Sequence, residues 1–387
     1  MERLQPVVFN DAWGSHVALA SLTGRSIPSR EPESELWMGA HEDGPATLVD
    51  CGGITLDQFI AQDPEGLLGA ENVATFGPRL PFLLKVLAPG RAISIQVHPT
   101  AEQAVAERGR SGDAVYVDDW AKPELLLAIA PFEVFVGMRT FEEITDLIDS
   151  LRVETLVKAA AVARDEADPI HALLSAILAT APADVPELTR RVVAACVRME
   201  SGGGELGEAA AAVVRVAEDH PDDIGLAVLL LMNHRTLQPG EFIDVAAGVL
   251  HSYVGGLGIE VLANSDNVVR AGLTSKTVNI PELLRIVDTT ADGVPGSARR
   301  VSDRVEVFDS AADRFGLHRI DASAGECVLG GPGPRIAFCL RGSVELQVAG
   351  QPPLHLADAE SAFLSAGDGD LTVRGTGELY VAGVPTA

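Results

Sequence analysis

The stretch Arg91-Ala92-Ile93-Ser94-Ile95-Gln96-Val97-His98-Pro99 alternates between apolar and polar residues. In a β-strand this alternation places the apolar side chains on one face and Ser94, Gln96 and His98 on the other. Polar side chains that face the inside of a barrel need hydrogen-bond partners or a ligand. Gln96 and His98 can both reach one bound ion, although a His-Pro pair at the end of a strand is also typical of an ordinary turn.

The composition indicates a globular chain with a large core and an acidic surface. Its 387 residues are 47% hydrophobic and 22% charged, and 29 basic against 55 acidic residues give a formal net charge of −26. Two or three structural units are expected at this length. Nucleic-acid binding depends on many lysine and arginine contacts to phosphate, so this charge balance argues against a nucleic-acid partner.

The sequence gives no sign of secretion or membrane insertion. The first six residues lack the apolar core of a signal peptide, and the longest strongly apolar run, Leu226–Met232, is far too short to span a bilayer. The four cysteines are scattered without a CxxC pair, which fits a reducing compartment. We therefore expect a cytoplasmic protein that has no membrane partner.

A change of hydrophobic period divides the chain. Residues 1–139 have the short apolar runs and Pro/Gly punctuation of strands and loops, and we assign them to the first part of a catalytic domain. A helical domain is predicted for residues 140–233, and it begins with the capping-box pattern Thr140-Phe141-Glu142-Glu143. Strand periodicity then returns, so residues 234–310 complete the catalytic domain and residues 311–387 form a C-terminal β-sandwich.

Apolar stripes predict individual helices within the helical domain. Asp168 and Pro169 make a favourable helix start. Alanine-rich segments predict helices over Pro186–Arg198 and Glu208–Glu218, and another helix is expected from Asp223 through Met232. These stripes indicate packing rather than chemistry.

Glu124 is a second candidate for chemistry. It opens the strongly apolar run 125–129, and Pro123 biases Lys122 toward an extended backbone. Taken alone, a carboxylate at this position is either a solvated strand start or a ligand.

The segment Gly240-Glu241-Phe242-Ile243-Asp244-Val245-Ala246-Ala247-Gly248-Val249-Leu250-His251 resembles the second cupin motif, G-x5-P-x-G-x2-H. In that motif a hairpin turn delivers a histidine into a small barrel. Ala246 stands where proline is usual, and Gly255 stands where an asparagine is expected. These departures leave the histidine itself, His251, in place.

Residues 258–276 carry a further group of polar side chains. Glu260 lies between two apolar residues, so in a strand it points to the opposite face from them. Asn264–Asn267 predicts a polar turn, and Arg270 follows two valines. None of these residues indicates a function by itself, but their combination does.

Together these segments make the chain similar to the type I phosphomannose isomerases, which are zinc enzymes of the cupin superfamily. The resemblance covers essentially the whole chain, because the motifs occur in family order around a helical insert. The matching segments are Trp13-Gly14-Ser15, Glu35-Leu36-Trp37-Met38-Gly39-Ala40-His41, Leu80-Pro81-Phe82-Leu83-Leu84-Lys85-Val86-Leu87, Gln96-Val97-His98-Pro99, Lys122-Pro123-Glu124, Gly248-Val249-Leu250-His251, and Asn264-Ser265-Asp266-Asn267 through Arg270 and Gly272-Leu273-Thr274-Ser275-Lys276.

The resemblance implies a mostly β fold with a helical insert: a cupin (jelly-roll) catalytic domain, an α-helical domain and a cupin-like C-terminal β-sandwich. It also implies one zinc ion per chain, held by Gln96, His98, Glu124 and His251, and a catalytic Arg270. Two imidazoles, a carboxylate and an amide oxygen suit Zn²⁺ and leave a position for a substrate oxygen or water.

The distribution of lysine agrees with a sugar-phosphate substrate. The chain has only four lysines, and three of them, Lys85, Lys122 and Lys276, lie inside the matching motifs. An acidic protein that binds a sugar phosphate needs a local positive pocket. The residues expected to contact the substrate are Lys85, Ser94, Tyr253, Asp266 and Lys276.

The implied activity is the reversible isomerisation of mannose 6-phosphate and fructose 6-phosphate by a monomer, in carbohydrate metabolism and GDP-mannose biosynthesis. We expect zinc-assisted proton transfer between C2 and C1 through a cis-enediol, with Arg270 and zinc stabilising the developing oxyanion. Lys122 and Glu260 are both candidates for the base. The family commonly has histidine before its Lys-Pro-Glu motif, and Ala121 at this position removes that histidine as a possible base.

Two rival functions remain open on the residues alone. An iron-dependent cupin dioxygenase would use two histidines and a carboxylate, without the glutamine ligand. A sugar-binding regulator with the same fold would need neither the complete ligand set nor Arg270 and Lys122.

Overall fold

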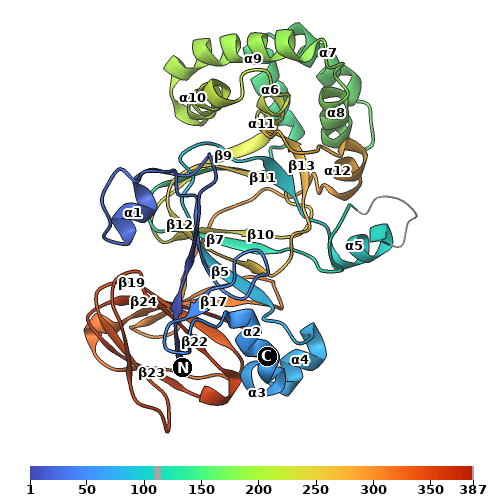
Figure 1. Cartoon of the computed structure of the whole chain (residues 1–387). Coiled ribbons are helices and arrows are strands. Elements are labelled where there is room, and N and C mark those ends of the chain that lie inside the picture. The colour runs from blue at the N-terminus through green and yellow to red at the C-terminus, as the bar shows by residue number, and fades with distance from the viewer. Residues whose placement is uncertain (109–114, 386–387) are drawn as a thin grey trace.

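The computed structural model describes residues 1–108 and 115–385. Five layers follow one another along the molecule (Figure 1): a helical domain, a five-stranded sheet, a seven-stranded sheet, and two further sheets of eight and four strands. The predicted fold class, mostly β with a helical insert, is confirmed. Within the described residues, every helix is too short or too polar to cross a lipid bilayer.

The two central sheets combine strands from both sides of the helical insert. The seven-stranded sheet has the order β14 (Gly296–Ser297), β10 (Glu241–Val245), β7 (Glu124–Ala128), β12 (Gly258–Ala263), β5 (Phe82–Leu87), β3 (Glu35–Met38) and β2 (Val7–Phe9). The five-stranded sheet has the order β13 (Val269–Gly272), β6 (Ile95–Val97), β11 (His251–Gly255), β8 (Phe132–Met138) and β9 (Met232–Leu237). Because β12 lies between β5 and β7, the seven-stranded sheet combines strands that come before and after the helical insert.

The alternation of side chains along a strand explains why the seven-stranded sheet contributes to two hydrophobic cores. In β7, Leu125 and Leu127 pack toward the eight-stranded sheet, whereas Leu126 and Ala128 join the core between the two central sheets. Successive side chains of a strand point to opposite faces. A continuous apolar run is therefore what a strand buried on both faces requires.

The helical domain covers the outer face of the five-stranded sheet (Figure 1) and shares its core. Its helices are α6 (Phe141–Leu151), α7 (Glu154–Ala163), α8 (Pro169–Leu178), α9 (Val185–Met199), α10 (Gly204–Asp219) and α11 (Gly225–Leu229). The capping box at Thr140 and the cap at Asp168 are confirmed, because each side chain accepts a hydrogen bond from the first turn of its helix. The helix predicted to run through Met232 was wrong: α11 ends at Leu229, and Met232 begins strand β9.

The C-terminal domain is a sandwich of the two remaining sheets. The larger sheet has the order β15 (Arg299–Arg300), β16 (Val305–Phe308), β17 (Gly316–Asp321), β24 (Glu378–Gly383), β19 (Arg335–Arg341), β22 (Ser361–Leu364), β1 (Glu2–Gln5) and β4 (Thr47–Leu48). The smaller sheet has the order β18 (Cys327–Leu329), β23 (Leu371–Gly375), β20 (Val344–Gln347) and β21 (Leu354–Leu356). Since β1 pairs with β22, the N-terminal strand is part of this sandwich.

The prediction that residues 1–139 contain only strands and loops was wrong. This part includes α1 (Ala18–Leu22), α2 (Leu56–Gln62), α3 (Pro64–Leu68), α4 (Ala70–Phe76) and α5 (Ala101–Arg108), and a further short helix, α12 (Ile280–Ile286), follows the second set of central strands. None of them exceeds eight residues, so each is shorter than the window in which helical periodicity becomes visible. Helices α2 to α4 pack beside the C-terminal sandwich (Figure 1).

Candidate active site

A cavity of about 810 Å³ opens between the two central sheets. Of the twelve residues predicted for the site, eleven line this cavity, and they are Lys85, Ser94, Gln96, Lys122, Glu124, His251, Tyr253, Glu260, Asp266, Arg270 and Lys276. The twelfth, His98, is completely buried behind the cavity wall, where it contacts Glu124. The structure therefore brings together segments that are up to about half the chain apart.

Strand register aligns one row of polar side chains on the five-stranded sheet. Gln96 is paired with His251 on one side and with Arg270 on the other. Paired residues of neighbouring strands present their side chains on the same face. The row from His251 through Gln96 to Arg270 therefore faces the seven-stranded sheet, from which Glu124 projects.

His98, Glu124 and His251 form a buried cluster whose ligand atoms lie within 4.8 Å of one another. The Nδ1 of His98 donates to the backbone oxygen of Asn267 at 2.6 Å, and the Nδ1 of His251 donates to that of Val249 at 3.0 Å. Because both Nδ1 atoms donate to backbone oxygens, the Nε2 atoms are the ring nitrogens that remain as possible ligands. These two Nε2 atoms lie 3.2 Å and 3.5 Å from the Glu124 oxygens.

This arrangement is the one that a bound cation would stabilise. Within the described residues, the Nε2 of His98 is buried and makes no hydrogen bond, although Glu124 is near. Burial lowers the pKa of His98 to about 4, so the ring is neutral at pH 7. The lone pair of the His98 Nε2 then faces the Glu124 carboxylate without a proton between them, which is a geometry that a positive ion stabilises.

Gln96 and Lys122 border this cluster. The Gln96 amide nitrogen donates to Ser94 Oγ at 3.0 Å, so the amide orientation leaves the Gln96 oxygen as a free acceptor. The Lys122 Nζ lies 3.2 Å from Glu124 Oε1. Burial would raise the pKa of Glu124, but Lys122 and His98 outweigh it and hold the pKa well below its usual range.

A second charged group lies on the seven-stranded sheet. Lys85, which was expected to contact the substrate, is buried with its Nζ 2.8 Å from Glu260 and 3.4 Å from Glu35. Burial would lower the lysine pKa, but the Glu260 and Glu35 carboxylates raise it, so Lys85 is charged. Burial raises the pKa of Glu260, whose Oε1 has no hydrogen-bond partner in the described part of the chain.

Asp266 is held by His41, a residue of the matching motifs that was not assigned to the site. The His41 Nε2 donates to Asp266 at 3.2 Å, and its Nδ1 accepts the Asp43 amide at 3.2 Å. The His41 hydrogen bond lowers the pKa of Asp266. His41, Asp43 and Asp266 lie close enough together to hold an ion. Both nitrogens of His41 are already used by hydrogen bonds, so these residues position Asp266 and do not form a metal site.

Sequence reasoning missed several residues that line the cavity. They are Asp11, Trp13, Glu35, Arg91, Asp219 and His220. Asp219 and His220 come from the end of α10, a helical segment that was assigned to packing. Their sequence position gave no signal, because only the tertiary fold brings the end of this helix to the cavity.

The fold and this site define a cupin-type enzyme with a buried group of side chains that could hold a metal ion. A family model of the phosphomannose isomerase type I catalytic domain matches residues 1–141. The chain is 34% identical to the mannose-6-phosphate isomerase of Escherichia coli K12 over 98% of both proteins, and 28% identical to mannose-6-phosphate isomerase 1 of Arabidopsis thaliana over 99% of this chain and 94% of that protein. The chain belongs to the type I phosphomannose isomerase family, so the predicted family and enzyme class are confirmed.

Solved structures of phosphomannose isomerases are similar to this chain over its whole length. A mutant of phosphomannose isomerase from Salmonella typhimurium has a TM-score of 0.89 to this chain, with 31% sequence identity and complete coverage of both chains. A mannose 6-phosphate isomerase bound with zinc and yttrium has a TM-score of 0.88, with the same identity and coverage.

Proposed function

We propose that the chain interconverts mannose 6-phosphate and fructose 6-phosphate at a single zinc centre formed by Gln96, His98, Glu124 and His251. The observation that carries this proposal is the convergence of the buried His98, Glu124 and His251, whose ligand atoms lie within 4.8 Å of one another. The relatives named mannose-6-phosphate isomerase support the substrate, and the neighbour bound with zinc supports the metal. We also propose that the protein is a monomer.

Zinc bound here would supply Lewis-acid polarisation of a sugar oxygen. The chain's own groups must position the open-chain sugar and move its protons. Among the described residues, Arg270 has no carboxylate partner, and burial lowers its pKa without removing its charge. An unpaired guanidinium beside Gln96 is suited to stabilise negative charge as it develops on a sugar oxygen.

Of the two candidate bases, Glu260 is favoured. Its Oε2 is fixed by Lys85, its buried Oε1 has no hydrogen-bond partner among the described residues, and Glu260 is one of the residues that line the cavity. Its raised pKa also makes it a better proton acceptor than an ordinary surface glutamate. In the proposed step, Glu260 takes the proton from C2 of the aldose, a proton moves from the C2 oxygen to the C1 oxygen through the cis-enediol, and Glu260 returns its proton to C1, so the reaction needs no further reagent.

A coupled assay with mannose 6-phosphate tests the activity directly. The purified protein should form fructose 6-phosphate without consuming oxygen, and metal analysis should find zinc rather than iron. Oxygen consumption with bound iron would instead favour a cupin dioxygenase. Binding of the sugar phosphate without turnover by the zinc-loaded protein would support a sugar-binding regulator.

A further inference from the structure

Three separate segments converge at one end of the active-site cavity. The register that pairs Arg270 with Gln96 and Gly272 with Ile95 carries the chain after β13 toward the residues that precede β6. The Thr274 amide there donates to Asp223 at 3.3 Å, so this turn is attached to the segment that follows α10. Arg91, Asp219 and Lys276 all line this part of the cavity wall.

Three cations of the cavity are paired with carboxylates in the described part of the chain, and these three differ in how firmly they are held. Lys85 and Lys122 lie deep in the cavity and are paired with buried carboxylates. Arg91 is instead paired with Asp219 at 3.4 Å, and 59% of the Arg91 side chain is exposed. Exposed ion pairs of this kind contribute little stability, so an incoming anion can displace the carboxylate at small cost.

We propose that Arg91 binds the phosphate group of the substrate, and that Asp219 holds Arg91 over the cavity until the phosphate replaces it. This inference rests on the proposed function. A guanidinium can form two parallel hydrogen bonds to phosphate oxygens, and a phosphate carries more negative charge than a carboxylate. Arg91 is thus a substrate-binding residue that distinguishes phosphorylated sugars from free ones, and Asp219 is a positioning residue.

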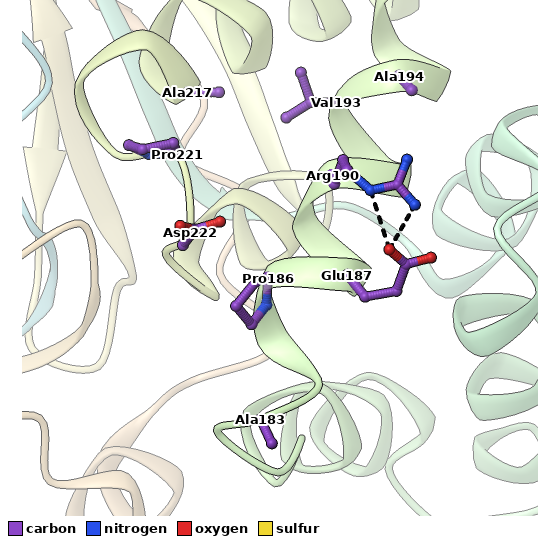
Figure 2. Close-up of a pocket in the computed structure, with 9 residues that line it drawn as sticks. All are labelled: Ala183, Pro186, Glu187, Arg190, Val193, Ala194, Ala217, Pro221 and Asp222. Atoms are coloured by element: carbon purple, nitrogen blue, oxygen red, sulfur yellow. Dashed lines mark hydrogen bonds and ion pairs between the residues drawn. The ribbon is translucent and has the colours of Figure 1, made fainter.

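A second cavity, of about 690 Å³, is lined by residues of α9 and of the segment after α10, and none of the residues predicted for the site lines it (Figure 2). Ala217, Pro221 and Asp222 form part of its wall. Its arginine, Arg190, donates through two of its nitrogens to Glu187 on the same helix, and the rest of the wall is mainly apolar. The phosphate is therefore assigned to the catalytic cavity.

The first test is Arg91→Gln in the zinc-loaded enzyme. The KM for mannose 6-phosphate should rise about tenfold or more with little change in kcat, and the inhibition constant of inorganic phosphate should rise by a similar factor, because a charge-assisted contact is lost. Arg299→Gln is the matched control, since the Arg299–Asp309 pair of the C-terminal domain has the same arginine exposure, 59%. This control should change neither constant.

The second test concerns Asp219. Asp219→Asn should lower the inhibition constant of inorganic phosphate by up to about fivefold, because Arg91 no longer has a competing partner. In the Arg91→Gln background the same substitution should have no effect. If Arg91 and Asp219 had only structural roles, the effect of Asp219→Asn on phosphate inhibition would not depend on the presence of Arg91.

Unchanged KM and inhibition constants in Arg91→Gln would overturn the assignment of Arg91. A rise in KM from Asp219→Asn in both backgrounds would overturn the role of Asp219 and would indicate that its carboxylate binds the sugar. The proposed function is tested separately, by asking whether the zinc-loaded, unmodified protein isomerises mannose 6-phosphate.

Discussion

At the scale of single residues, backbone carbonyl groups decide what the two histidines can do. The Asn267 and Val249 oxygens fix the Nδ1 protons of His98 and His251, which turns both Nε2 lone pairs toward Glu124. Asn267 is itself buried, and its side-chain amide donates to the backbone oxygens of Asp118 and Trp120. A hydrogen-bonded outer layer of this kind orients metal ligands and tunes their basicity.

Arg270→Ala should preserve bound zinc and the fold but lower kcat by about 10²–10³, the usual effect of removing one donor that stabilises an oxyanion. Arg270 neighbours Gln96 through strand pairing and contributes no ligand atom to the His98, Glu124 and His251 cluster. Steady-state kinetics together with metal analysis check this prediction. An unchanged kcat with a raised KM would make Arg270 a substrate-binding residue instead.

Isotope exchange separates the two candidate bases. In D₂O, fructose 6-phosphate converted to mannose 6-phosphate should gain deuterium at C2, because a protein base exchanges its proton with solvent. Glu260→Gln should reduce both turnover and exchange by about 10²–10⁴ while zinc is retained. The matched variant is Lys122→Met, and exchange that survives in Glu260→Gln but disappears in Lys122→Met would identify lysine as the base.

At the scale of elements, an ionic cluster attaches the helical domain to the five-stranded sheet. Glu133 of β8 accepts from His234 of β9 at 2.7 Å and from Arg215 of α10. Burial would raise the pKa of Glu133, but the hydrogen bonds from His234 and Arg215 lower it. The cluster therefore stabilises the folded state when Glu133 is ionised.

Glu133→Gln should destabilise the protein by about 1–3 kcal/mol at pH 7, because Arg215 and the buried His234 lose their charged partner. The folded-state pKa of Glu133 is below the unfolded value, so its contribution is present above the unfolded pKa and is lost as pH falls through the folded pKa. The melting temperatures of the unmodified protein and of Glu133→Gln should therefore differ most near neutral pH and become similar in acid. Glu154→Gln, which removes an exposed pair with Lys158, is the control and should leave the melting temperature unchanged. A pH-independent difference between the melts would contradict the assignment.

The sequence predicted best those features that local patterns encode. The alternation around Gln96 and the cap at Thr140 depend on neighbouring residues, and both are found where they were expected. The position of β1 in the C-terminal sandwich depends on pairing with Ser361–Leu364, which no local pattern contains. Asp219 and His220 were missed for the same reason, because only long-range packing places the end of α10 at the cavity.

At the scale of the whole molecule, the active site is a product of the layered architecture. The five-stranded sheet supplies Gln96, His251 and Arg270, and the seven-stranded sheet supplies Lys85 and Glu260. The helical domain adds residues at one end of the cavity. The chain carries a net charge of −26, and five of its basic residues line this cavity beside seven acidic ones, so an anionic substrate depends on individual cations rather than on the net charge of the cavity.

The most direct test of the zinc-dependent isomerase proposal is a titration of chelator-treated protein with Zn²⁺, followed by mannose 6-phosphate isomerisation and metal analysis on the same samples. Activity should be absent without metal and should rise in proportion to bound zinc until one ion per chain is reached. His251→Ala should bind well below one zinc ion and stay inactive, whereas His355→Ala, which changes an exposed histidine of the C-terminal sandwich, should behave like the unmodified protein. Full activity in a metal-free preparation would contradict the account.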